Sequence, residues 1–382
     1  MIFLDYASAT PVSEAAKEAM APYESAQFFN PSAPYLAAKN VRDDYERAKS
    51  DLAHLIGAKG DDLVVTSGAT EANNLAFSAL ELVESPTVLV LETDHASILN
   101  TAKKYPTELI RVDRTGLIDL EDFQNKLTRN VAFVSIALAN NELGTIQPLA
   151  EVAQIIKRER MARLVAGDAR PLYLHSDASQ ALNLVPISVA RLGVDLLTLS
   201  AAKVYGPKGV GALYHGHNVK LAPIATGGGQ ESGLRSGTEN VAGLVGFAKA
   251  ATEAKKHQTY NRKHYEKLRQ VLKSELEQSE IAPLFLGNPK HQLANFCPVS
   301  FPGLDAERLI YLLEDDEIYL STGAACAASK GEPSHVLKAI GLNSREIAGS
   351  LRISLGAENT EDDMRIAGQK IITAIKTELA RK

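Results

Sequence analysis

Apolar runs alternate with amphipathic stretches over the first two-thirds of this chain. The continuous apolar runs stand at 62–66, 87–91, 131–139, 171–175 and 195–199. Helical patterns follow some of them, from Glu71 onward and at about 148–160. Runs without polar alternation are typical of strands buried on both faces, and their alternation with helices predicts a mostly parallel sheet flanked by helices. We therefore expect a doubly wound α/β fold here.

The pattern changes after about residue 250. Residues 254–279 predict a long amphipathic helix, and shorter strand-like and helical segments follow it. The last of these is a C-terminal helix with Thr360 as its N-cap. We expect a smaller α+β domain made of 1–13 and 253–382, with a loop at about 321–331, beside a large domain of 14–252.

Composition narrows the class of protein. The 382 residues are 45% hydrophobic and 23% charged, which is ordinary for a globular protein with a large core. The net charge of −5 gives no basic signature, so we expect no direct contact with nucleic acid. Two cysteines exclude a disulfide framework. Neither a signal peptide nor an apolar run of ~18 residues is found, so we expect a cytoplasmic protein without a membrane segment.

Polar residues gather where the predicted strands end. They are found in SGATEANN (67–74), ETDHAS (92–97), NNELGT (140–145), SDASQ (176–180) and SAAK (200–203). In an open parallel sheet, ligands bind outside the carboxyl ends of the strands. Hydroxyl, amide, imidazole, carboxylate and amine groups should therefore meet at one edge of the sheet, and we interpret this edge as a site.

The types of these residues indicate a cofactor. Lys203 is either a solvated loop lysine or an amine that forms a Schiff base. Thr70 is either a helix N-cap or, with the N–H groups around it, a phosphate ligand. A buried carboxylate suits a pyridinium nitrogen, and an imidazole can stack on a flat ring. Taken together, these groups describe a site for pyridoxal phosphate (PLP).

A series of motifs extends this interpretation over nearly the whole chain. They are LDYASATP, FFNPSAP, SGATEANN, ETDHAS, NNELGTIQP, HSDASQAL, SAAKVYGPKG, GGGQESGLRSGTEN, STGAACAAS and LRISLG. In this order they resemble the cysteine desulfurases of the NifS/IscS type, which are class V aminotransferases with PLP-dependent fold type I. The STGAACAAS segment resembles that of the group I enzymes.

The resemblance implies roles for particular residues. Lys203 would form the Schiff base with PLP and carry protons, His95 would stack on the ring, and Asp177 would keep the pyridine nitrogen protonated. Further cofactor contacts are expected from Ala69, Thr70, Asn141, Gln180 and Ser200, and from Thr238 across a homodimer interface. Substrate contacts are expected from Asn30, Asn141 and Arg352. Without the resemblance, His95 reads as a helix cap or a core histidine, Asp177 as a helix N-cap, and Arg352 as half of a structural salt bridge.

The two cysteines differ in their surroundings. Cys326 lies among small residues without an apolar period, whereas Cys297 lies in the strand-like ANFCPVSF and is expected in the core. In the family, the cysteine at the position of Cys326 takes sulfur from L-cysteine as a persulfide and L-alanine leaves. An acceptor protein, serving iron–sulfur cluster assembly or tRNA thiolation, would then receive the sulfur. No metal site is expected, because His215 and His217 read as a surface turn.

Two positions depart from the family pattern. Ala202 stands where relatives usually carry a histidine that helps to hold the PLP phosphate, and Tyr35 stands where many have histidine. Losing one hydrogen bond to a charged group costs roughly 1.5–3 kcal/mol, so PLP binding is expected to weaken unless another group compensates. The alternatives are a selenocysteine lyase or another PLP-dependent carbon–sulfur lyase, and an inactive sulfur-relay scaffold.

Overall fold

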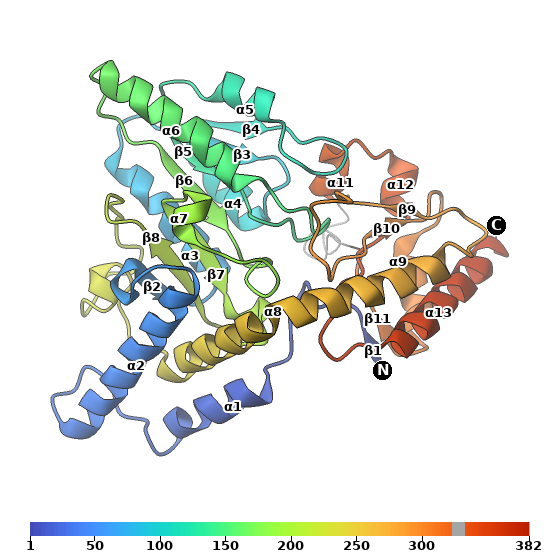
Figure 1. Cartoon of the computed structure of the whole chain (residues 1–382), viewed down its shortest axis with the longest axis horizontal. Helices are drawn as coiled ribbons and strands as arrows, with labels where there is room; N and C mark the ends of the chain where they lie inside the picture. The colour runs from blue at the N-terminus through green and yellow to red at the C-terminus, as the bar shows by residue number, and fades with distance from the viewer. Residues whose placement is uncertain (323–332, 382) are drawn as a thin grey trace.

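The computed structural model of the chain describes residues 1–322 and 333–381. At its centre lies a seven-stranded sheet in the order β2-β8-β7-β6-β5-β3-β4, in which β8 alone runs antiparallel to its neighbours (Figure 1). Its strands are β2 (Leu63–Thr66), β3 (Thr87–Leu91), β4 (Thr107–Ile110), β5 (Val131–Ser135), β6 (Tyr173–Asp177), β7 (Leu196–Ser200) and β8 (Gly211–His215). The expectation of a mostly parallel α/β sheet is confirmed.

The apolar runs located the buried strands within about two residues. The run at 87–91 coincides with β3, whereas β6 and β7 extend to Asp177 and Ser200, so these polar residues end their strands rather than follow them. The run at 131–139 is regular only to Ser135, although Leu138 N still donates to Asp177 O at 2.9 Å. Two strands were not predicted: β4, which lies at the sheet edge and is partly exposed, and β8, which begins with a glycine.

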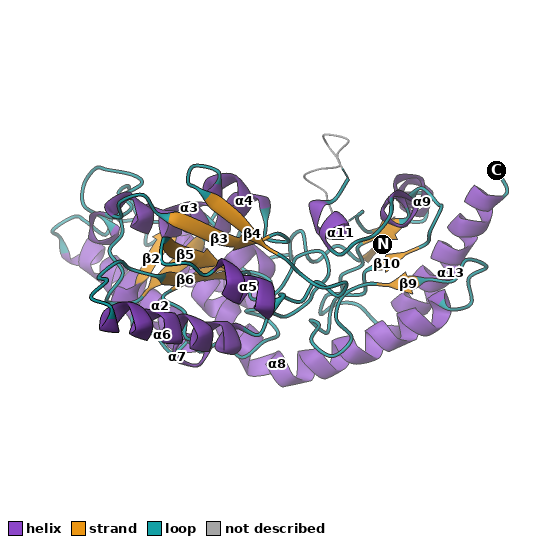
Figure 2. Ribbon diagram, turned by 90° about the horizontal axis from the view of Figure 1, so that it is seen from above, coloured by secondary structure: helices purple, strands orange, loops and turns teal. Residues whose placement is uncertain are grey.

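Helices cover both faces of the sheet. The buried side chains of α3 (Ala69–Phe77) and α4 (Ala96–Ala102) belong to the apolar cluster on one face. Those of α2 (Leu36–Leu55), α5 (Leu120–Lys126), α6 (Leu149–Val165) and α7 (Val189–Leu192) belong to the cluster on the other. Figure 2 shows these two layers on opposite sides of the strands.

Helix α8 (Val241–Leu276) is a single continuous helix of 36 residues. It packs against α1 (Glu14–Met20) and α2 at one end of the molecule and against α13 (Glu361–Leu379) at the other (Figures 1 and 2). It therefore runs without a break through residues 252 and 253, where we placed the boundary between the domains. The division into 14–252 and 1–13 with 253–382 stays a prediction.

The part of the molecule beyond the large sheet mixes short strands with helices. A three-stranded antiparallel sheet has the order β12-β10-β9, and the N-terminal strand β1 pairs in parallel with β11. These elements are β1 (Ile2–Phe3), β9 (Leu284–Phe285), β10 (Val299–Ser300), α9 (Ala306–Glu314), β11 (Ile318–Tyr319), α11 (His335–Ala339), α12 (Ser344–Ala348) and β12 (Ser350–Leu351). Helix α13 begins at the predicted cap, where Thr360 Oγ1 accepts a hydrogen bond from Asp363 N.

Short 3-10 segments complete the described secondary structure. They are η1 (Ala21–Glu24), η2 (Gly60–Asp62), η3 (Ser78–Leu82), η4 (Ala201–Lys203) and η5 (Glu231–Gly233). Of these, η4 matters most for the site, because it follows β7 directly and carries Lys203.

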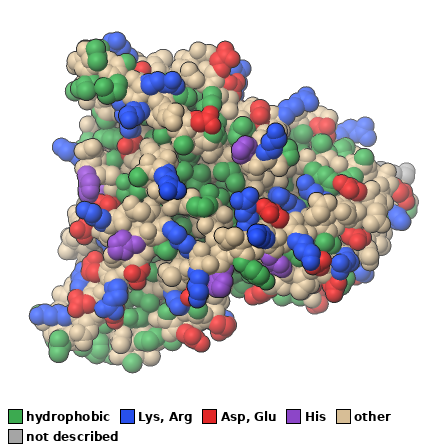
Figure 3. All heavy atoms as spheres, in the orientation of Figure 1, with side chains coloured by type: hydrophobic (Ala, Val, Ile, Leu, Met, Phe, Trp, Pro, Cys, Tyr) green, Lys and Arg blue, Asp and Glu red, His purple; other side chains and the backbone are tan. Residues whose placement is uncertain are grey.

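The core and the surface agree with the composition. Cys297 is buried in the core as predicted, and burial raises the pKa of its thiol to about 11. Acidic and basic side chains are interspersed over the face shown in Figure 3. Within residues 1–322 and 333–381, no helix is both long and apolar enough to cross a bilayer.

Candidate active site

Lys203 lies at the carboxyl end of β7, where the sequence placed it. Its Nζ donates hydrogen bonds to Ala7 O at 2.8 Å and to Ser8 O. Gln180 Nε2 donates to the same Ala7 carbonyl at 2.9 Å. The N-terminal segment therefore joins Lys203 and Gln180, which arrive from different strand ends. The sequence pattern of this segment does not by itself predict these contacts.

Asp177 ends β6 and is 9% exposed. Its Oδ2 accepts a hydrogen bond from Asn73 Nδ2 at 2.9 Å, and its Oδ1 accepts one from Ser179 N at 2.9 Å. Asn73 is fully buried on α3 and also donates to Ser97 Oγ at 2.9 Å. The carboxylate is thus fixed in orientation. Asn73 lies in the SGATEANN motif, but its role depends on this contact, which no local pattern reveals.

His95 is the N-cap of α4, as its structural reading predicted. Its Nδ1 accepts a hydrogen bond from Ser97 N at 3.1 Å and lies 2.8 Å from Ser97 Oγ. Desolvation of the ring by the surrounding protein lowers the pKa of His95. The negative charge of Asp177 raises this pKa, and the positive charge of Lys203 lowers it further. An imidazole whose orientation is fixed through Nδ1 suits stacking on a ring, so the two readings of His95 are compatible.

The N-terminus of α3 offers room for an anion. Gly68 precedes the helix with φ +152°, and a Cβ added there would meet nothing within 4 Å. Thr70 and His95 line one hollow of about 480 Å³ beside it. Ser200 pairs with Gly211, and a Cβ at Gly211 would lie 2.8 Å from the backbone of Gly68, so β7 and the helix N-terminus are close.

The side chain of Ala202 cannot donate the hydrogen bond that a histidine at this position would give to the PLP phosphate. Its carbonyl accepts hydrogen bonds from Thr10 N at 3.0 Å and Thr10 Oγ1 at 3.1 Å. A cation does lie near the first turn of α3, where Arg235 Nε donates to Glu71 Oε1 at 2.8 Å. Ala202 therefore contributes backbone contacts only.

Arg352 is 5% exposed and lies beside the N-terminal segment. Its Nη2 donates to Asp5 Oδ1 and to Ser8 Oγ, both at 2.7 Å, and its Nη1 donates to Asn141 O at 3.2 Å. The structure thus brings together Arg352 and Asn141 as predicted, and it adds Asp5 and Ser8. Arg352 does form a salt bridge, with Asp5, as expected for a structural role, but this salt bridge lies within the site.

The residues on either side of 323–332 are held near this site by hydrogen bonds. Ser321 exchanges backbone hydrogen bonds with Arg352. Ser334 Oγ donates to the buried Glu142 Oε2 at 2.6 Å, and His335 Nε2 donates to Asp94 O at 3.0 Å. Burial raises the pKa of the Glu142 carboxyl. Cys326 itself lies outside the described residues.

Asn30 and Thr238 are both exposed. Asn30 Oδ1 accepts a hydrogen bond from Ser32 N at 2.9 Å within its own turn, and among the described residues no hydrogen bond joins Asn30 to Arg352. Arg42 instead links this turn to the Thr238 segment, with Nε donating to Pro31 O at 3.3 Å and Nη2 paired with Glu239 Oε1 at 3.0 Å. The expected contact of Asn30 with the substrate therefore stays a prediction.

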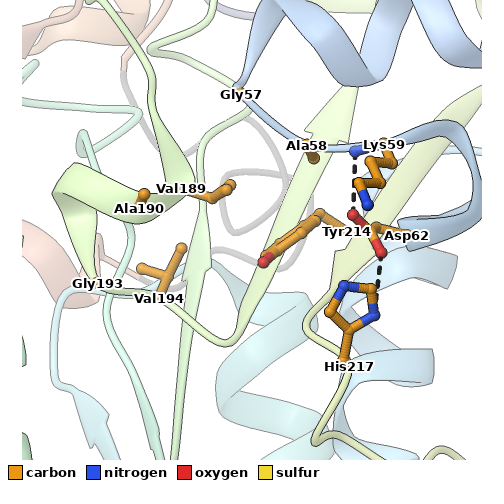
Figure 4. A pocket seen from close by; sticks show the side chains of 10 residues that line it. All are labelled: Gly57, Ala58, Lys59, Asp62, Val189, Ala190, Gly193, Val194, Tyr214 and His217. Atoms are coloured by element: carbon orange, nitrogen blue, oxygen red, sulfur yellow. Dashed lines mark hydrogen bonds and ion pairs between the residues drawn. The ribbon is translucent and has the colours of Figure 1, made fainter.

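A second hollow lies away from these residues. It measures about 470 Å³ and is lined by residues that include Lys59, Asp62, Tyr214 and His217 (Figure 4). Because β8 runs antiparallel, its first residue, Gly211, lies at the Ser200 end of β7, and this hollow adjoins the other end. His217 Nδ1 and Asp62 Oδ1 are 3.5 Å apart, but the described residues contain no cluster of three or more metal-ligating side chains.

The site residues fit PLP. An amine, a buried and oriented carboxylate, an imidazole and an open helix N-terminus converge at one edge of the sheet. Lys203 would hold the aldehyde carbon, Asp177 the ring nitrogen, and Thr70 and Ser200 the phosphate.

Comparison with known proteins agrees with this geometry. The profile of the aminotransferase class-V family matches residues 2–366. Cysteine desulfurase IscS 1 of Archaeoglobus fulgidus is 39% identical over 372 residues, covering 95% of this chain and 94% of that protein.

Solved structures give the same result. A NifS-like protein superposes with a TM-score of 0.90 at 31% identity, covering 98% of this chain and 99% of the other. SspA in complex with cysteine gives a TM-score of 0.79 at 30% identity, covering 93% and 99%. The chain therefore belongs to the NifS/IscS-type cysteine desulfurases, which are PLP-dependent enzymes of the aminotransferase class-V family.

Proposed function

We propose that this protein removes sulfur from L-cysteine, releases L-alanine and carries the sulfur as a persulfide on Cys326. The observation that carries the proposal is that Lys203 and Arg352 contact the same short segment, Asp5–Ser8. An amine for the cofactor and a guanidinium for a carboxylate thus stand side by side, as an α-amino acid requires. The similarity to SspA in complex with cysteine supports this choice of substrate.

Each residue has a distinct task in this proposal. Arg352 and Asn141 bind the substrate carboxylate side, and Lys203 moves the proton at the substrate Cα. His95 stacks on the ring and Asp177 holds its nitrogen protonated, while Gln180 contacts the cofactor oxygen. Bound PLP supplies an electron sink for the charge that develops at Cα. The phosphate is held by Ala69, Thr70 and Ser200.

Cys326 completes the sulfur transfer as a thiolate. Its sulfur forms a bond to the substrate sulfur while the carbon–sulfur bond breaks. The electron pair of the broken bond stays with carbon, which takes up a proton to give alanine. Ser321 is hydrogen-bonded to Arg352, and Ser334 is hydrogen-bonded to Glu142. These contacts support a role at this site for the residues between Ser321 and Ser334.

We further propose a cytoplasmic homodimer that delivers the sulfur to an acceptor protein. Exposed Thr238 would contact the phosphate in the neighbouring subunit, and the contacts of Arg42 put the Asn30 turn beside it. Iron–sulfur cluster assembly and tRNA thiolation are the two destinations we consider. Sedimentation of the purified protein gives its oligomeric state, and Thr238→Ala should weaken PLP binding only if the dimer forms.

An assay of alanine and sulfide formed from L-cysteine tests the activity. The PLP-loaded protein should form both products in the presence of a thiol. Lys203→Ala should abolish both, whereas Lys208→Ala, an exposed lysine in the following turn, should leave both unchanged. Cys326→Ala should lose activity with cysteine; if it retains that activity, a selenocysteine lyase or another lyase is the better assignment. A wild-type protein that binds no PLP would favour the scaffold.

A further inference from the structure

The segment Asp5–Ser8 contacts the two sides of the site at once. The carbonyls of Ala7 and Ser8 accept hydrogen bonds from Lys203 Nζ, and the side chains of Asp5 and Ser8 accept hydrogen bonds from Arg352 Nη2. Lys203 and Arg352 are far apart in the sequence. Four consecutive residues therefore set the separation between the amine and the guanidinium.

The contacts at Arg352 form a closed triangle. Asp5 Oδ1 and Ser8 Oγ each lie 2.7 Å from Nη2, and Ser8 Oγ donates to the second oxygen of Asp5. The guanidinium is planar, so fixing Nη2 also fixes Nη1, which points to Asn141 O. A flexible side chain is thereby restricted to one orientation.

The segment is itself anchored to the strand-like stretch that carries Arg352. Asp5 forms a bridge with Ser354, Ala7 N donates to Ser354 Oγ at 2.8 Å, and Tyr6 N donates to Ser354 O at 3.4 Å. Ser354 is fully buried. Asp5 and Ser8 are therefore held beside Arg352 both by their contacts with the guanidinium and by the contacts of their segment with Ser354. Residues that orient a binding group need to be held in place in this way.

We propose that Asp5 and Ser8 are positioning residues that aim the guanidinium of Arg352 at the carboxylate of the amino acid substrate. The inference rests on the proposed function, because it takes Arg352 as the carboxylate ligand. Asp5 keeps the buried cation paired, and the triangle holds its direction before a substrate arrives. A purely structural salt bridge would instead tie the N-terminus down and have no effect that depends on the ligand's carboxylate.

A pair of ligands separates these two roles. L-alanine carries the carboxylate, whereas ethylamine is the same molecule without it, and titration of the PLP-loaded protein by absorbance gives a dissociation constant for each. In Asp5→Asn and in Ser8→Ala, we expect the Kd of L-alanine to rise roughly tenfold, as loss of a charge-assisted hydrogen bond predicts, and that of ethylamine to change less than about twofold.

Two controls make the outcome decisive. Asp362→Asn breaks an exposed salt bridge with Arg365 far along the chain and should leave both constants unchanged. Ser8→Ala keeps the charge of Asp5, so it carries the test if Asp5→Asn does not fold. Equal weakening of both ligands, or no change for L-alanine, would overturn the inference alone. Failure of the wild-type protein to bind L-alanine would overturn the proposed function and the inference together.

Discussion

Asn73 Nδ2 lies 2.9 Å from Asp177 Oδ2, and both side chains are buried at the junction of α3 and β6. Replacing Asn73 with alanine leaves that oxygen without its amide donor, so the carboxylate that would hold the ring nitrogen loses a contact that fixes its orientation. We expect the Kd for PLP to rise about tenfold or more, the equivalent of roughly 1.5–3 kcal/mol. Titration of the cofactor-free protein with PLP measures it. Asn40→Ala, on the exposed face of α2, should leave the Kd unchanged, and equal constants for Asn73→Ala and wild type would contradict the prediction.

A substitution at Ala202 is expected to lower the Kd for PLP rather than raise it. Ala202→His restores the residue that relatives usually carry, and an added hydrogen bond to the phosphate should lower the Kd for PLP by about tenfold or more. Tyr35→His makes the other family substitution, but Tyr35 is 51% exposed at the start of α2, so it should leave the Kd unchanged. If Ala202→His does not tighten binding, another group already occupies that position.

Glu231 holds the glycine-rich loop against the large sheet. Its carboxylate pairs with Lys49 Nζ at 3.0 Å and accepts hydrogen bonds from Val65 N at 2.8 Å and from the Tyr45 hydroxyl. The loop at 227–237 is therefore fixed at this point in the single chain. Glu231 itself adopts φ +49°, a conformation that side chains rarely take.

Glu231→Ala would leave Lys49 buried without its partner, because the two side chains are only 5% and 9% exposed. We expect the free energy of unfolding to fall by about 3–5 kcal/mol, measured by denaturant titration. Glu14→Gln removes a carboxylate that pairs with Lys17 at an exposed site and should change it by less than about 0.5 kcal/mol. Similar losses for both variants would show that burial does not govern the contribution of this pair.

Asp94 is fully buried between His95 and the strand end, and burial raises the pKa of its carboxyl to about 8. Because the folded-state pKa lies above the unfolded value, the folded state binds more protons in between. The protonation of Asp94 therefore adds to the free energy of unfolding below pH ~4, and this contribution is lost as the pH rises toward 8.

Asp94→Asn removes this titration. Relative to wild type, we expect its free energy of unfolding to improve by up to about 1.4 kcal/mol per pH unit between pH 5 and 8, measured by denaturant titration at each pH. Asp51→Asn, at an exposed position on α2, should show no such trend. A difference between Asp94→Asn and wild type that stays constant with pH would contradict the assignment.

The sequence alone located five of the seven strands of the large sheet and the polar groups at their ends. Apolar runs marked β3, β6 and β7, and the polar residues at their ends, among them Asp177 and Lys203, do converge. The cap at Thr360 was visible because it involves residues a few positions apart. Such features depend on local periodicity and capping, which adjacent residues fix.

Only the tertiary structure decided which distant groups meet. β8 inserts antiparallel between β2 and β7, an arrangement set by pairing partners rather than by its own short sequence. The contacts of Asp5 and Ser8 with Arg352 join residues more than 340 positions apart, and Arg42 links the Asn30 turn to the Thr238 segment. No local pattern carries this information, because contacts over such separations follow from the path of the whole chain.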